Sequence, residues 1–135
     1  MGEILTLKNW EVYMVTAVLG ASSDPDRYAY KAMEMLAEYK HEAIPVHPRE
    51  DSVLGKKVWK GLSELADSGQ KVDTLTMYVN AALTTKLLPD IIKLKPRRVI
   101  FNPGAENSTL EHGLQDAGIE VVHGCTLVML RTGQY

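Results

Sequence analysis

The residues best suited to chemistry lie in a short turn after an apolar run near the start of the chain. Gly20, Ala21, Ser22 and Ser23 follow that run directly, and Arg27 comes soon after them. A glycine lets the backbone approach a phosphate closely, and the N-terminus of a following helix supplies free N–H groups and the positive end of its dipole. The two serine hydroxyls add donors, and an anion nearby would explain Arg27. The pattern suits a phosphate or pyrophosphate site, but it equally suits an ordinary serine-capped turn with a solvated arginine.

A second pair of candidate contacts, Pro48 and Arg49, follows the next apolar run. Folds that bind NAD place an Asp or Glu here to bond the ribose hydroxyls, whereas this chain has no acid before Glu50. An arginine at this place suits bidentate contact with a phosphate on the adenosine ribose, although a surface loop can also carry one without a ligand. The residues therefore favour CoA, with its 3′-phosphate, or NADP, with its 2′-phosphate, over NAD.

Two further strand ends contribute polar groups. Tyr78, Val79 and Asn80 follow one strand and are placed to flank an adenine or a pyrophosphate. The segment 102–107, which contains Gly104, follows another strand and leads into a helix. Two helix N-termini that converge on one crevice favour an anionic ligand.

The residues give little support for catalysis or for a metal. None of the histidines forms a pair at metal-ligand spacing; they are His41, His47, His112 and His123. Cys125 lies two residues after His123, but neighbours at a strand end rarely meet as nucleophile and base. A small buried cysteine is also an ordinary core residue. We therefore predict no catalytic residue and no metal site.

These residues can act together only if the fold brings the strand ends to one place. Apolar runs predict strands at 13–19, 43–46, 57–59, 74–79, 98–101 and 119–122. Helical periodicity predicts helices over about 26–40, 61–66 and part of 83–94, and one that begins at Asn107 or Ser108 and ends before Gly118. This order predicts an α/β protein with one doubly wound, mostly parallel, Rossmann-like sheet and helices on both faces. Right-handed crossovers then bring the ends of the first and fourth strands together at the switch point.

Three local features refine these limits. Pro45 is awkward inside a fully paired strand, and Pro89 is expected in the first turn of its helix. The segment from Ser108 to Glu111 matches a capping box. At Gly20, close backbone approach to a ligand predicts that Gly20→Val abolishes binding and leaves the protein folded.

Composition sets the remaining bounds. The 135 residues suit one domain, which we place at 12–135 after an N-terminal arm of residues 1–11, and 45% hydrophobic residues suffice for its core. A net charge of −2 argues against a nucleic-acid surface. No apolar run reaches membrane-spanning length. One cysteine and no signal peptide predict a cytoplasmic protein.

Several motifs together resemble the bacterial CoA-binding domain family, whose members are similar to the nucleotide-binding domain of the succinyl-CoA synthetase α subunit. The motifs are Val18-Leu19-Gly20-Ala21-Ser22 with Asp24-Pro25, then Pro45-Val46-His47-Pro48-Arg49, Val53-Leu54-Gly55-Lys56-Lys57 and Val72-Asp73. The resemblance runs from about Met14 to Met129. His47 stands where the family usually has asparagine, and residues 102–105 depart from an apolar-rich family segment.

The resemblance implies roles for the residues that match. Gly20, Ala21 and Ser22 would hold the CoA pyrophosphate. Pro48 and Arg49 would lie by the 3′-phosphate, and the segment 78–80 would flank the adenine.

The sequence therefore predicts a stand-alone protein that binds CoA or an acyl-CoA and acts as a non-catalytic carrier, sensor or regulatory module. The alternative is a small NADP-binding oxidoreductase subunit. Against it, neither Tyr28 nor Tyr30 has a lysine at the Tyr-x-x-x-Lys interval. The expected partner is a small nucleotide ligand, together with a second copy of the chain or an unknown protein, but no nucleic acid and no membrane.

Overall fold

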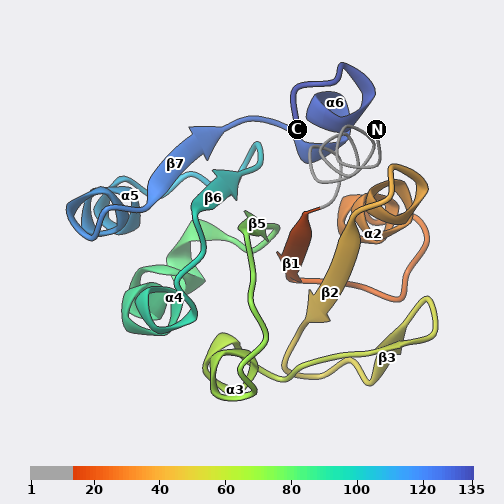
Figure 1. The fold of residues 1–135 in the computed structure, drawn as a ribbon, viewed down its shortest axis with the longest axis horizontal. Helices are drawn as coiled ribbons and strands as arrows, with labels where there is room; N and C mark the ends of the chain where they lie inside the picture. Colours follow the sequence, from red (N-terminus) through yellow and green to blue (C-terminus); the bar gives the residue numbers. More distant parts are fainter. Residues whose placement is uncertain (1–13) are drawn as a thin grey trace, which may run out of the picture.

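The structure is a computed structural model and describes residues 14–135, so the predicted arm over residues 1–11 lies outside the described part. Five parallel strands form one sheet in the order β2-β1-β5-β6-β7 (Figure 1). They are β1 (Val15–Leu19), β2 (Glu42–Val46), β5 (Thr74–Met77), β6 (Arg98–Phe101) and β7 (Glu120–His123). The helices are α2 (Tyr28–Glu38), α3 (Leu62–Asp67), α4 (Leu88–Leu94), α5 (Ser108–Asp116) and α6 (Thr126–Arg131), with short 3-10 turns η1 (Ala81–Leu83) and η2 (Thr85–Leu87). The predicted Rossmann-like α/β fold is confirmed.

Helices cover both faces of the sheet, as the unbroken apolar runs of its central strands require. Helices α2 and α6 lie on one face, and α3, α4 and α5 lie on the other (Figure 1). Alternate side chains of β1 therefore enter different cores. Ala17 and Leu19 join the cluster beneath α3, α4 and α5, whereas Val18 joins the cluster beneath α2 and α6.

The chain changes direction across the sheet at β1. It passes from β1 to β2 on one side and later returns to β5 on the other side, so β1 lies between them. Leu19 is in register with Met77, and the Tyr78 N–H donates to the Leu19 carbonyl at 2.9 Å. The ends of the first and fourth predicted strands thus meet, as the crossover rule predicted.

The free edge of β2 is partly covered by the segment that follows it. Residues 52–57 form a small hairpin of β3 (Ser52–Val53) and β4 (Lys56–Lys57), and Trp59 pairs with Val46 by a single bridge. The predicted strand over 57–59 is confirmed only in part: Lys57 belongs to β4, Trp59 contacts the main sheet by one bridge, and Val58 lies between them. Pro45 is tolerated because β2 is an edge strand, and its carbonyl still accepts from the Trp59 N–H at 3.0 Å.

Helix α5 begins with a cap built on the residue before the predicted box. The Asn107 side chain accepts from the Leu110 N–H at 3.1 Å, and the Asn107 N–H donates to the Glu111 carboxylate at 2.8 Å. The reciprocal cap therefore uses Asn107 and not Ser108. At the other end Gly118 has a φ of 82° and follows the helix, as predicted for a C′ glycine.

Two other helix boundaries bear on the predictions. Pro89 lies in the first turn of α4, as expected. Helix α6 was not predicted, and it packs beside α2 at the end of the chain (Figure 1). Its six residues are too few to show a helical period clearly.

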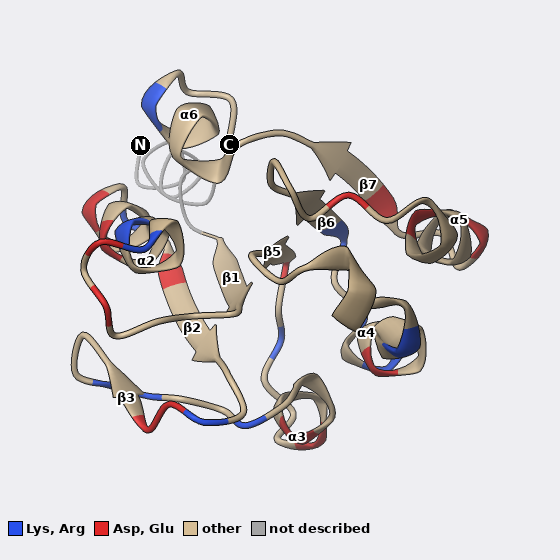
Figure 2. Cartoon of the chain, turned by 180° about the vertical axis from the view of Figure 1, so that it is seen from behind, with Lys and Arg blue, Asp and Glu red and all other residues tan. Residues whose placement is uncertain are grey.

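Charge is distributed without a dominant sign. Acidic and basic segments are interspersed along the ribbon (Figure 2), consistent with a net charge of −2. Because no broad basic surface is present on the ribbon of residues 14–135, an anionic ligand must be held by a few well-placed groups.

Within residues 14–135, no helix combines the length and the apolar character that crossing a membrane requires.

Candidate functional site

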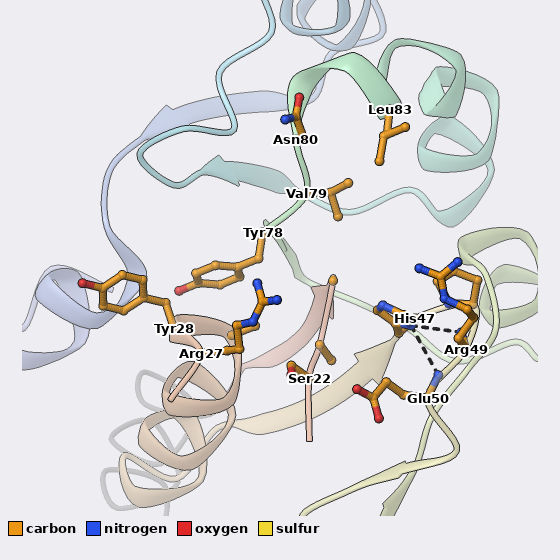
Figure 3. Close-up of a pocket in the computed structure, with 14 residues that line it drawn as sticks. Ser22, Arg27, Tyr28, His47, Arg49, Glu50, Tyr78, Val79, Asn80 and Leu83 are labelled. Carbon is orange, nitrogen blue, oxygen red and sulfur yellow. Dashed lines mark hydrogen bonds between the residues drawn. The ribbon is translucent and has the colours of Figure 1, made fainter. Parts of the chain in front are cut away.

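A cavity of about 530 Å³ opens at the carboxyl ends of β1, β2 and β5, at the switch point of the sheet. It brings together nine of the residues predicted from sequence (Figure 3). These are Gly20, Ala21, Ser22, Arg27, Pro48, Arg49, Tyr78, Val79 and Asn80. The fold thus assembles these residues from three separate segments.

Two predicted residues do not line this cavity. Ser23 lies beside it, and its backbone N–H donates to the Glu50 carboxylate at 3.2 Å. Gly104 lines a second cavity of about 260 Å³, whose wall also includes Asn80. The turn 102–105 before the second helix thus borders an adjoining cavity, and the two cavities share the segment 78–80. Whether Gly104 contacts the ligand stays a prediction.

The conformation of Gly20 is set by the packing of the strand ends. Its φ is +91°, and a Cβ atom built on it would lie 2.7 Å from the Tyr78 carbonyl oxygen. Its N–H is already bonded to the Val46 carbonyl at 2.9 Å. A glycine is thus needed here whether or not a ligand binds, so a larger residue is expected to cost stability as well as binding.

The turn between β1 and α2 is stabilised by its own polar side chains. The Ser22 hydroxyl accepts from the Asp24 N–H, and the Asp24 carboxylate accepts from the Asp26 N–H, both at 3.0 Å. Such local bonds fix a loop without help from secondary structure. They leave the Ser22 hydroxyl proton free to be donated to a ligand.

Helix α2 begins at Tyr28 and not at Asp26, because Arg27 has the extended backbone of an N-cap residue. The Arg27 side chain makes no capping hydrogen bond, and the first turn of α2 contains no acid. The first N–H groups of a helix have no intrahelical partner, and Tyr28 and Ala29 line the cavity. The positive end of α2 therefore faces the cavity beside the Arg27 side chain.

The loop after β2 presents a second arginine. Among residues 14–135, neither Arg27 nor Arg49 forms an ion pair or a side-chain hydrogen bond with another residue. Arg27 comes from the start of α2 and Arg49 from the loop beyond β2 (Figure 3). Two guanidinium groups and a helix N-terminus thus share one cavity, which is an arrangement suited to an anion with more than one phosphate.

One acid lies in the lining, and sequence reasoning did not include it. Glu50 accepts a hydrogen bond from the Ser23 N–H, and that bond lowers the pKa of the carboxyl from its ordinary value. The carboxylate is therefore charged at neutral pH and lies at the edge of the cavity (Figure 3). The Glu50 carboxylate is bonded to the Ser23 N–H, which is one of the backbone donors of the turn predicted to hold phosphate.

We expect Glu50→Gln to tighten the binding of an anionic nucleotide by about two- to fivefold at low salt, because it removes a negative charge from the wall. The change is measured by calorimetric titration, and added salt should shrink it. Glu38→Gln, the same charge change at the far end of α2, is the control and should have no effect. Weaker binding by Glu50→Gln would show instead that the carboxylate holds the turn in its binding conformation.

The third wall is largely apolar. The Tyr78 ring packs against the core cluster beneath α2 and α6, and its hydroxyl is buried without a hydrogen-bond partner among residues 14–135. Burial raises the pKa of Tyr78 well above its ordinary value, so the side chain stays neutral. Val79 and Leu83 border the same wall, and Leu83 is 57% exposed. An exposed leucine at a cavity mouth suits the flat face of a base.

The wall is held in place from α5. The Asn107 side-chain amide donates to the Ala81 carbonyl at 3.2 Å and to the hydroxyls of Thr84 and Thr85 at 2.9 Å. The Asn80 side chain also accepts from the Ala82 N–H at 2.9 Å. These bonds fix the turns η1 and η2, which carry Leu83.

Asn102, in the segment that departs from the family pattern, is buried and structural. Its amide donates to the Thr76 hydroxyl and the Met77 carbonyl, and its oxygen accepts from the Thr126 N–H at 2.9 Å. It therefore joins β5, β6 and α6. Both the nitrogen and the oxygen of this buried amide are thus hydrogen-bonded.

The remaining reactive side chains lie outside the cavity. His123 contacts Glu111 at 2.7 Å, and Cys125 is the N-cap residue of α6. Within residues 14–135, no group of three or more His, Cys, Asp or Glu residues is placed to hold a metal ion.

A doubly wound parallel sheet with a cationic cavity at its switch point defines a Rossmann-like domain. The profile of the CoA binding domain family matches residues 14–131, and the chain belongs to this family. Its resemblance to the CoA-binding domain is thus confirmed over nearly the whole described part.

Individual relatives support this membership. The chain is 40% identical over 110 residues to the α subunit of the ADP-forming acetate–CoA ligase II of Pyrococcus furiosus, a match that covers 79% of this chain and 23% of that subunit. The chain therefore spans less than a quarter of that relative. Among solved structures, an uncharacterized protein is 43% identical with a TM-score of 0.82, covering 91% of this chain and 98% of the other. A Thermus thermophilus protein is 26% identical with a TM-score of 0.82, covering 100% and 99%.

Proposed function

We propose that the protein binds CoA or a short acyl-CoA in the cavity at the ends of β1, β2 and β5. The observation that carries this proposal is the pairing of Arg27 and Arg49 with the N-terminus of α2 around one cavity. The pyrophosphate would lie against the turn 20–22 and the first N–H groups of α2. The 3′-phosphate would lie by Arg49, and the adenine by Val79 and Leu83.

The role we propose is that of a non-catalytic carrier, sensor or regulatory module in the cytoplasm, acting with a second copy of the chain or another protein. The cavity presents the groups of a binding site, namely guanidinium, hydroxyl and backbone N–H. Its imidazole, that of His47, already accepts two backbone hydrogen bonds through Nδ1. Transfer chemistry, as the name of the acetate–CoA ligase implies for that enzyme, would then need groups from elsewhere.

An NADP-binding oxidoreductase subunit is the second candidate, because Arg49 suits a 2′-phosphate as well as a 3′-phosphate. Family membership favours CoA. The two candidates differ in the ligand that each would select.

We expect CoA or acetyl-CoA to raise the melting temperature by several degrees at a large excess over its dissociation constant, NADP to raise it less, and NAD hardly at all. A ligand that binds only the folded state stabilises it by mass action. NAD lacks the ribose phosphate that Arg49 would contact. The measurement is a thermal unfolding series at matched nucleotide concentrations, and a larger shift with NADP than with CoA would promote the oxidoreductase reading.

A further inference from the structure

The loop that carries Arg49 is shaped by one imidazole nitrogen. His47 Nδ1 accepts from the Arg49 N–H at 2.9 Å and from the Glu50 N–H at 3.3 Å (Figure 3). The His47 N–H donates to the Trp59 carbonyl at 2.9 Å, which ties the residue to the segment beyond the hairpin. The ring therefore bridges the end of β2 and the backbone of the residue that would contact a ribose phosphate.

These two bonds fix the protonation state of the ring. Nδ1 must present its lone pair to the two N–H groups, so the proton of the neutral ring is on Nε2. A proton on Nδ1 would face two donors and would remove the acceptor. The loop conformation and the imidazolium form of His47 therefore exclude each other.

The arrangement has the form of an Asx turn with a different acceptor. In such a turn, the side-chain oxygen of Asn or Asp accepts from the N–H two residues further on. His47 performs the same task with Nδ1. An asparagine would keep its acceptor at every pH, whereas an imidazole loses this acceptor when Nδ1 is protonated.

We propose that His47 is the positioning residue for Arg49, and that protonation of its ring releases the loop and weakens recognition of a ribose phosphate. The ligand part of this proposal rests on the proposed function. The Arg49 guanidinium has no partner among residues 14–135, so the backbone turn is what directs it toward the cavity.

Charged groups of both signs surround the ring. Arg49 adjoins it on its own loop and Arg27 lines the same cavity, and both oppose an imidazolium, whereas the Glu50 carboxylate favours one. Lys60 donates to the Glu50 backbone carbonyl at 2.6 Å and forms an ion pair with Asp51 at 3.0 Å. The charges of Lys60 and Asp51 therefore compensate each other. The formed loop requires a neutral ring, so it is favoured at high pH and lost as the pH falls.

The loop can be tested without a ligand, by nuclear magnetic resonance of the free protein across about pH 5 to 8. We expect His47 Nδ1 to be unprotonated in the neutral ring. The amide signals of Arg49 and Glu50 should move with the same midpoint as the ring. In His47→Asn both amide signals should stay fixed, because the acceptor no longer titrates. A neutral ring with its proton on Nδ1, or amides that ignore the titration of the ring, would overturn the proposal.

Ligand binding tests the consequence for Arg49. We expect His47→Ala to weaken the binding of CoA about tenfold, because the turn loses the hydrogen bonds that hold it. The binding of dephospho-CoA should change little. His47→Asn should restore the affinity for CoA. Any pH dependence of CoA binding that remains in this variant should come from titration of the 3′-phosphate itself. Equal losses for both nucleotides in His47→Ala would refute the positioning role. If wild-type protein bound no CoA, the proposed function would fail, while the amide titration would still decide the role of His47.

Discussion

Gly20→Ala should lower the free energy of unfolding by about 2–5 kcal/mol, and Gly104→Ala by only about 1–2 kcal/mol. Both glycines have nearly the same positive φ, +91° and +93°. A side chain in this region costs about 1–2 kcal/mol by itself. Only at Gly20 would the new Cβ also meet a rigid neighbour, the Tyr78 carbonyl oxygen at 2.7 Å, and such overpacking adds about 1–3 kcal/mol.

The comparison is made by urea unfolding followed by circular dichroism, with both variants at the same pH and salt concentration. Because the backbone term is shared, the difference between the two variants measures the contact between the ends of β1 and β5. Equal losses of stability would show that this contact is loose enough to accommodate a methyl group. The glycine would then be free to serve a ligand, as the sequence suggested.

The strand ends could be predicted because they depend on local patterns and on one general rule of connection. The apolar run before Gly20 is continuous since β1 is buried on both faces. Right-handed crossovers then require β5 to lie beside β1. Most of the cavity follows from these two facts, so its residues could be named before the structure was known.

The hairpin over residues 52–57 could not be predicted with the same ease. Its turn consists of Leu54 and Gly55, which both have positive φ, 50° and 76°. A two-residue turn of this kind is normally signalled by Asn-Gly or Asp-Gly. Leucine is unusual there, so the segment carried no recognisable turn signal and its strand was placed too late.

The contributions of Glu50 and His47 were hidden for another reason. Their contacts, to the Ser23 N–H and to the loop backbone, depend on the side-chain geometry of turns. Sequence spacing indicates which segments meet but not which nitrogen or oxygen faces which donor. One signal for His47 came with the family resemblance, which implies an asparagine at this position, because the two side chains can accept the same bond.

Arg49→Ala should weaken CoA by about 1.5–3 kcal/mol, the value of a hydrogen bond to a charged group, and leave dephospho-CoA nearly unchanged. The guanidinium lines the cavity after β2 without a partner among residues 14–135, so its removal breaks no internal bond. Arg27→Ala is the matched control. It removes the same charge from the side of the cavity at the start of α2, so it should weaken both nucleotides alike.

Calorimetric titration of CoA and dephospho-CoA into wild-type protein and Arg49→Ala is the measurement that tests the recognition of a ribose phosphate most directly. Four dissociation constants at one salt concentration isolate the coupling between the guanidinium and the 3′-phosphate. We predict that wild-type protein prefers CoA by at least about tenfold, and that Arg49→Ala abolishes this preference while still binding dephospho-CoA. Equal affinities of the wild-type protein for the two nucleotides, or a preference that survives in Arg49→Ala, would contradict the site as assigned.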